Sequence, residues 1–334
     1  MTSTSSSLSS IEMSQLWGSY INDSALLCQL SHFSVHTEDE KIKELLLKCC
    51  ELSKAHLKTL KELFDKEQFA VPYGFNVNED CYLTSSRLYT DSFYLTYILH
   101  MSRIAIQTYS LSLSYSSRAD IFSYFSECLK ETGELLRTAT TLLLERGEYV
   151  KPPEIPVPTT KGYVEGQHFL SGFIGKKRSL TVIEISQLFA NFERNQLGVK
   201  VMTSFLQVSK DPEVKKLMNR GIEIATKHCD ILEKKLIENH LPAPISSDIG
   251  VTESTEPTFS EKLMTFFTSS LIGLSVGYYG QALGASPRRD LGINYDRLIH
   301  ELLLFSEDAA QLMIKKEWLE QPPIAPDRDK LIHE

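Results

Sequence analysis

Apolar side chains recur every three or four positions along several long stretches of the chain, which is the spacing of one face of an amphipathic helix. Two of these stretches share one pattern, and each carries a single histidine within its apolar stripe. The stripes are Ile42, Leu45, Cys49, Leu52, His56, Leu60 and Leu63 in one stretch, and Val214, Leu217, Gly221, Ile224, His228 and Leu232 in the other. The pattern predicts an all-α protein.

The chain contains two copies of one sequence unit. With Leu8 placed over Leu180, a shift of 172 residues (180 − 8), the copies align without a gap as far as Pro72 and Pro244. After a loop of variable length the shift becomes 170 residues (279 − 109). The pairs matched there include Tyr109 with Tyr279, Arg118 with Arg288, Asp120 with Asp290 and Glu131 with Glu301. Because this period is far too long for a solenoid, each copy is expected to be a complete domain.

Capping signals predict four helices in each copy. The first helix opens at a capping box, which is Ser9 with Glu12 in one copy and Thr181 with Glu184 in the other. The third helix is expected at about residues 86–115 and 260–285. The fourth is expected after Ser116, and in the second copy after Ser286 as N-cap with Pro287 in the first helical position.

Loop lengths predict the topology of each copy. The first and second helices, and the third and fourth, are joined by turns of a few residues, so each pair is expected to be antiparallel. The second and third are joined by long connections near residues 71–85 and 243–259. About 15 extended residues reach roughly 50 Å, and a helix of about 30 residues is roughly 45 Å long. Each connection can therefore cross over the whole bundle, as in ferritin-like four-helix bundles.

These signals predict two tandem ferritin-like bundles, at residues 1–150 and 180–334. The linker at 151–179 is rich in proline at first and then aromatic and basic. Because each copy has its own caps, stripes and stop signals, a fragment of residues 172–334 is expected to fold alone.

Charge and composition exclude several classes of function. The formal net charge is −8, and no basic stripe with interleaved aromatic residues is present, so nucleic acid is not an expected partner. The N-terminus lacks the features of a secretory signal, and the six cysteines include no CxxC pair. Buried free thiols in a reducing, cytoplasmic compartment are therefore expected. The uncharged stretch 263–285 contains many hydroxyl side chains, which favours a buried helix with small residues for close packing over a membrane span.

Ferritin-like bundles commonly hold two metal ions through glutamates and Glu-x-x-His motifs, but the chain contains no Glu-x-x-His. His56 and His228 are favoured as buried, neutral rings that are hydrogen-bonded to a neighbouring helix. The alternative is a metal or small-ligand site, for which the candidates are His228, Glu301, Asp308 and His56, with iron or manganese as the metal. No catalytic residues and no cofactor are expected. Arg118 and Arg288 are expected to pair at the surface with Asp120 and Asp290.

Three segments of the second copy resemble a known family. They are residues 180–189 (LTVIEISQLF), 286–291 (SPRRDL) and 318–328 (WLEQPPIAPDR). Together they resemble the domain-of-unknown-function family 3231 of endospore-forming Gram-positive bacteria, some members of which are named as candidate spore coat proteins. The resemblance covers nearly the whole chain as two copies. It implies a ferritin-like bundle that is cytoplasmic or spore-associated, and it supplies no catalytic residues.

Three functional hypotheses follow from the sequence. The first is a structural or protein-interaction protein that binds protein partners or itself and belongs to the proteinaceous layers of a spore. The second is a metal-dependent oxidase or metal store with a degenerate site. The third is a helical bundle that binds a small ligand. Elemental analysis separates the second from the other two.

Overall fold

The computed structural model describes residues 7–173, 177–244 and 250–333. Within these residues the regular elements are helices, and the β-type pairing consists of isolated bridges such as Tyr89 with Val251. The all-α prediction is confirmed. Two compact units can be distinguished, and each contains four long helices.

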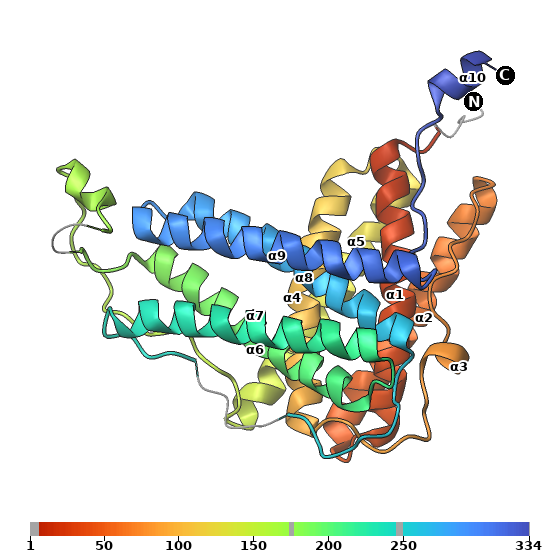
Figure 1. Cartoon of the computed structure of the whole chain (residues 1–334), viewed down its shortest axis with the longest axis horizontal. Coiled ribbons are helices and arrows are strands. Elements are labelled where there is room, and N and C mark those ends of the chain that lie inside the picture. The colour runs from red at the N-terminus through yellow and green to blue at the C-terminus, as the bar shows by residue number, and fades with distance from the viewer. Residues whose placement is uncertain (1–6, 174–176, 245–249, 334) are drawn as a thin grey trace. The chain divides into compact units, whose positions relative to one another are not determined.

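In the first unit the long helices are α1 (Ser10–His36), α2 (Glu40–Lys66), α4 (Asp91–Tyr115) and α5 (Ala119–Glu145). In the second they are α6 (Val182–Val208), α7 (Pro212–Ile237), α8 (Glu261–Ala285) and α9 (Arg289–Lys315). Helix α6 contacts α7 and α8, and α9 contacts the same two helices, so α6–α9 form a closed four-helix bundle (Figure 1). Short elements are α3 (Val77–Asp80), the 3-10 helix Gln167–Leu170 and α10 (Arg328–His333).

Both predicted capping boxes are present. Ser9 and Glu12 cap each other at the start of α1, as do Thr181 and Glu184 at the start of α6. The predicted cap at Ser286 is wrong, because Ser286 ends α8 and α9 begins at Arg289. The backbone N–H of the residue before α9, Arg288, donates instead to Glu184 Oε1 at 3.2 Å. A carboxylate from a neighbouring helix therefore caps α9 in place of a local serine.

The third helix of the first repeat starts later than predicted. Helix α4 begins at Asp91, and Tyr89 lies before it in an antiparallel bridge with Val251. The Thr90 N–H donates to the Gly250 carbonyl at 3.1 Å, and the Thr252 N–H donates to the Leu88 carbonyl at 2.9 Å. These backbone hydrogen bonds hold the segment extended. A pairing between residues so far apart in the chain leaves no local sequence signal.

That extended segment belongs to the second unit although it comes from the first repeat. The first unit comprises Met1–Thr84, Tyr94–Leu142 and Glu317–Glu334, and the second comprises Ser85–Phe93 and Leu143–Lys316. Within the second unit, Leu88, Tyr89 and Phe93 are each at most 2% exposed. Tyr89 also shares a buried hydroxyl–hydroxyl hydrogen bond with Ser204 of α6. The segment is therefore part of the core of the second unit.

A reciprocal exchange completes the first unit. The C-terminal segment Glu317–Glu334 belongs to it, and the Glu320 carboxylate accepts the backbone N–H groups of Tyr73 and Gly74 at 2.8 and 3.0 Å. Gly74 has φ +58°, a conformation that favours glycine. Each repeat thus supplies one segment to the unit built mainly from the other repeat.

Helix α8 contains the uncharged stretch at residues 263–285. Among the described helices, none has the length and apolar character that a crossing requires. The helix packs in the bundle through buried residues such as Met264, Ile272 and Tyr279. Its glycines at 273, 277, 280 and 284 are exposed, with no side chain near the place of a Cβ. The prediction that these small residues allow close helix packing is therefore wrong. All six cysteines are buried free thiols.

Candidate functional sites in the bundle cores

Each bundle places one polar residue from each of its four helices at the same level of its core. In the second repeat they are Asn195, His228, Tyr279 and Glu301, and in the first they are Asp23, His56, Tyr109 and Glu131. The two sets match residue by residue in the repeat alignment, with shifts of 172 for the first two positions (195 − 23) and 170 for the last two (301 − 131). The histidine is buried in both because its stripe neighbours are apolar.

The four residues of the second-repeat set are joined in series by hydrogen bonds. Asn195 Nδ2 donates to the Tyr279 hydroxyl at 2.8 Å, and that hydroxyl lies 3.0 Å from His228 Nδ1. His228 Nε2 lies 3.0 Å from Glu301 Oε2. Because the amide group can only donate, the phenol proton goes to Nδ1, and Nε2–H donates to the carboxylate. This assigns a neutral ring with its proton on Nε2.

Electrostatics agree with that assignment. Burial lowers the pKa of His228, and the opposing effect of Glu301 does not overcome it. Lys227 Nζ donates to Glu301 Oε1 at 2.6 Å, so the carboxylate has an ammonium partner. The prediction of a buried, neutral histidine hydrogen-bonded to a neighbouring helix describes His228 well.

The first-repeat set differs because Asp23 replaces the amide. His56 Nε2 lies 2.9 Å from Glu131 Oε2, and Nδ1 lies 3.5 Å from Asp23 Oδ2. Burial acts to lower the pKa of His56, but Asp23 and Cys128 together outweigh it and the pKa rises to about 11. His56 is therefore charged at neutral pH, which differs from the neutral ring expected from the sequence. Asp23 Oδ2 and His56 Nδ1 are both buried and have no hydrogen-bond partner among the described residues.

A cavity of about 60 Å³ lies beside this pair. Asp23, His56, Tyr97 and Tyr109 line it together with the side chains of Leu26, Leu30, Cys49, Leu52, Ser53, Ile98, Met101, Ser102, Ala105, Thr132 and Leu135. Since a buried water needs only about 10–15 Å³ measured in this way, the cavity has room for a small polar molecule.

The candidates predicted from the sequence are brought together only in part. His228 meets Glu301, and His56 meets the equivalent Glu131. Asp308 lies seven residues beyond Glu301 (308 − 301), about two helical turns away, where it forms an ion pair with Arg220. Within the described ranges, no three His, Cys, Asp or Glu side chains are arranged to hold a metal ion. Asp23 was missed, although the exchange of Asp for Asn between the repeats was visible in their alignment.

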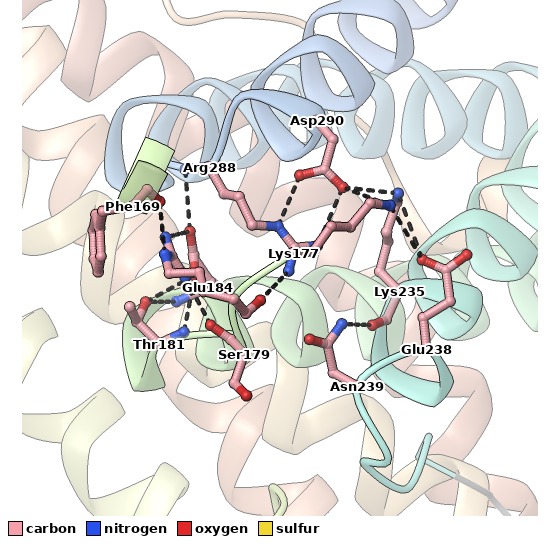
Figure 2. Close-up of polar contacts among 11 residues, drawn as sticks. Phe169, Lys177, Ser179, Thr181, Glu184, Lys235, Glu238, Asn239, Arg288 and Asp290 are labelled. Atoms are coloured by element: carbon pink, nitrogen blue, oxygen red, sulfur yellow. Dashed lines mark hydrogen bonds and ion pairs between the residues drawn. The ribbon is translucent and has the colours of Figure 1, made fainter. Parts of the chain in front are cut away.

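A second buried polar cluster lies at the start of α9. Arg288 is fully buried and holds Asp290 through two hydrogen bonds, from Nε at 2.7 Å and from Nη2 at 3.1 Å (Figure 2). Lys235 Nζ reaches the same carboxylate at 3.1 Å. Burial acts to raise the pKa of Asp290, but the bonds from Arg288 and Lys235 outweigh it and lower the pKa. Glu184 is also fully buried and is bound by Arg178 through both carboxylate oxygens.

Arg288 pairs with Asp290 as predicted, but the prediction that the pair lies at the surface is wrong. The pair exists but is buried, because the α6 terminus and the preceding linker cover it. In the first repeat Arg118 also pairs with Asp120, and the arginine is buried while 31% of the Asp120 side chain stays exposed. Both clusters have a structural role at the start of a helix.

Comparison with known proteins gives one family. A family model described as a protein of unknown function (DUF3231) matches residues 1–160 and, a second time, residues 168–331. The chain belongs to this family. The resemblance and the tandem arrangement predicted from the sequence are thus confirmed. No curated protein matches the chain.

One solved structure is similar to part of this DUF3231 protein. It is the crystal structure of a "putative spore coat protein" from Bacillus halodurans. The two are 18% identical with a TM-score of 0.43, and the match covers 45% of this chain and 98% of that one.

Replacing His228 with leucine is expected to reduce the loss of stability at acid pH. The folded-state pKa of His228 lies below its unfolded value, so the unfolded state binds more protons below about pH 6.5. Its contribution to stability is therefore complete above that pH and falls as the pH drops. His32 is also buried, with its pKa lowered to about 3, so the difference between wild type and variant isolates His228. Urea unfolding from pH 4 to 8 measures it.

His56→Leu is the matched control, with the opposite sign. Its raised folded pKa means that the charged ring stabilises the protein below about pH 6.5, and this contribution is lost as the pH rises toward 11. Wild-type and His228→Leu curves that run parallel over the acid range would contradict a buried neutral ring at this position.

Proposed function

We propose that this protein is a structural or protein-interaction protein, with protein partners or other copies of itself as its ligands. The observation that carries the proposal is the reciprocal exchange of segments: Ser85–Phe93 completes the second unit and Glu317–Glu334 completes the first. Such an exchange makes each unit depend on a segment of the other repeat, and in the second unit that segment is part of the core. Repeats that are linked by exchanged segments suit a structural role.

The polar residues of the second core are hydrogen-bonded to one another, and this supports the same proposal. From Asn195 to Glu301, the hydrogen bonds use the donors and acceptors that a catalytic site would direct toward a substrate. Buried networks that are satisfied in this way specify and stabilise a core. We further infer ferritin-like connectivity for each bundle, supported by the long connections at residues 67–90 and 238–260.

The outer face of α9 supports association with protein. Leu303, Leu304 and Ile314 are each at least 50% exposed. In the first repeat the position equivalent to Leu304 is Glu134 (304 − 170), so the two repeats differ in polarity at this position. Sedimentation of the full chain over a range of concentrations tests self-association, and Leu304→Glu is expected to reduce it. A chain that stays monomeric and captures no defined protein partner would contradict the proposal.

We place the protein in the cytoplasm or in the proteinaceous layers of a spore. The spore alternative is supported by the family resemblance, since some members are named as candidate spore coat proteins. A fluorescent fusion expressed in a sporulating cell tests it. Signal at the spore periphery supports a coat role, whereas signal that stays in the vegetative cytoplasm and is absent from spores rejects it and leaves the scaffold proposal standing.

Protein purified without chelators is expected to contain no stoichiometric iron or manganese. The reason is that His228 and Glu301 already satisfy each other, and Asp308 is occupied by Arg220. Elemental analysis of wild type and of His228→Leu measures this. One metal ion per chain in the wild type that disappears in the variant would favour the ferritin-like metal store or oxidase.

A further inference from the structure

The polar sets in the two cores differ in net charge. In the second repeat, the Glu301 carboxylate is balanced by the Lys227 ammonium, and His228 is neutral. In the first repeat, Asp23 and Glu131 are two carboxylates beside one imidazole. Even with a charged His56 ring, the first set is short of one positive charge.

Lys227, whose ammonium group balances the Glu301 carboxylate in the second repeat, has no counterpart in the first repeat. The residue equivalent to Lys227 is Ala55 (227 − 172). Among the described residues, His56 is the one cationic partner with which Asp23 and Glu131 form ion pairs. The first repeat therefore carries the same carboxylate–histidine pair as the second, with one more carboxylate and without the ammonium group.

The cavity lies beside Asp23 and His56, so a molecule in it can contact the Asp23 carboxylate. Asp23 is 95% buried (5% exposed), and its Oδ2 atom has no hydrogen-bond partner in the part of the chain that the structure describes. A buried carboxylate oxygen without a hydrogen-bond donor costs free energy, and the ion pair with His56 Nδ1, at 3.5 Å, is too long to be that hydrogen bond. Tyr97 and Tyr109 also line the cavity, and aromatic faces attract cations. Its volume of about 60 Å³ suits a group of a few heavy atoms.

We propose that the first repeat binds the primary ammonium group of a small amine in the cavity beside Asp23 and His56. The ammonium donates a hydrogen bond to Asp23 Oδ2 and supplies the positive charge that Lys227 supplies in the second repeat. The small apolar remainder of the amine lies against the aliphatic and tyrosine side chains. This site is independent of the scaffold role, which does not require a ligand.

Methylammonium is the probe, and the full chain is titrated with it while the ring signals of His56 and His228 are followed by NMR. We expect saturable shifts of the His56 signals with little change at His228. Sodium and tetramethylammonium, at matched ionic strength, are expected not to reproduce them, because neither can donate a hydrogen bond. Equal responses to all three cations, or no saturable shift with methylammonium, would overturn the proposal.

Two variants make the first repeat resemble the second. Asp23→Asn introduces the amide of Asn195 and removes the acceptor charge, and Ala55→Lys introduces the ammonium of Lys227. Because Asp23→Asn removes a hydrogen bond to a charged acceptor, it is expected to weaken methylammonium binding by roughly tenfold to a hundredfold. Ala55→Lys is expected to weaken it as well. Folding of each variant is checked by circular dichroism, and unchanged affinity in folded Asp23→Asn would reject the site.

The reverse exchange provides a gain of function. A chain with Asn195→Asp and Lys227→Ala has the first-repeat charges in the second repeat. We expect the His228 signals of this variant to respond to methylammonium. A response at His228 supports charge as the determinant, and none in a folded variant refutes the idea that charge alone is sufficient.

Discussion

A fragment of residues 172–334 is expected to be largely unfolded, in contrast to the expectation from the repeat pattern. The fragment lacks Ser85–Phe93, which belongs to the second unit and buries Leu88, Tyr89 and Phe93 there. Burying one large apolar side chain contributes about 1.5–3 kcal/mol, so losing three costs roughly 5–9 kcal/mol. That is comparable with the whole stability of a typical domain, about 5–15 kcal/mol. Circular dichroism and urea unfolding measure the loss.

Adding back the missing segment tests the cause. A fragment of residues 143–316 mixed with a peptide of residues 85–93 contains the second unit in full, and the peptide is expected to restore helicity and a cooperative transition. In the full chain, Tyr89→Ala is expected to destabilise the second unit, while Tyr82→Ala is the control because Tyr82 lies in the same connection but is 45% exposed. A 172–334 fragment as stable as the intact chain would mean that the segment is dispensable.

Local signals explain what could be predicted. The capping boxes at Ser9 and Thr181 depend on residues three apart, and the stripes of α2 and α7 depend on helical periodicity, so both are present in the sequence itself. The four helices of each repeat follow from these signals.

Long-range contacts explain which parts of the fold could not be predicted from the sequence. The start of α4 depends on the pairing of Tyr89 with Val251, and the start of α9 depends on a carboxylate from α6. Neither partner is near in sequence, so local cap rules placed the start of α4 too early and assigned the α9 cap to Ser286.

The polar cores differ from both cases, because the sequence contains the relevant signal but only a comparison of the two repeats shows it. Asp23 lies in a helix rich in small and polar residues, so periodicity gives it no special place. Its meaning comes from the other repeat, where Asn195 occupies the same position. Asp23, together with Cys128, raises the pKa of the histidine in the first repeat, whereas burial lowers it in the second. Comparison of the two repeats as variants of one site would have found it.

Arg288→Ala is expected to destabilise the second bundle by about 3 kcal/mol, the lower end of the cost of breaking a buried ion pair, because Asp290 loses the guanidinium group but keeps its ion pairs with Lys235 and Lys177. Arg288 is fully buried and makes two hydrogen bonds to Asp290, which is 3% exposed. Its Nη1 atom also donates to the Arg178 carbonyl at 3.1 Å, which fixes the linker to the start of α9. Lys235 and Lys177, whose Nζ atoms lie 3.1 and 3.7 Å from Asp290 Oδ2, do not replace the paired hydrogen bonds or the contact with the linker. Hydrogen exchange of the α9 amides, together with urea unfolding, measures the loss for this unit.

Three further variants separate the charge from the packing. Arg118→Ala is the matched control, since Asp120 is 31% exposed in its side chain and water can solvate it, so a smaller loss is expected. Arg288→Lys keeps the charge but not the paired hydrogen bonds, and should fall between wild type and Arg288→Ala. Adding Asp290→Ala to Arg288→Ala removes the buried carboxylate that has lost its guanidinium partner, and should recover part of the stability. If Arg288→Ala costs no more than Arg118→Ala, burial of this pair does not determine its contribution.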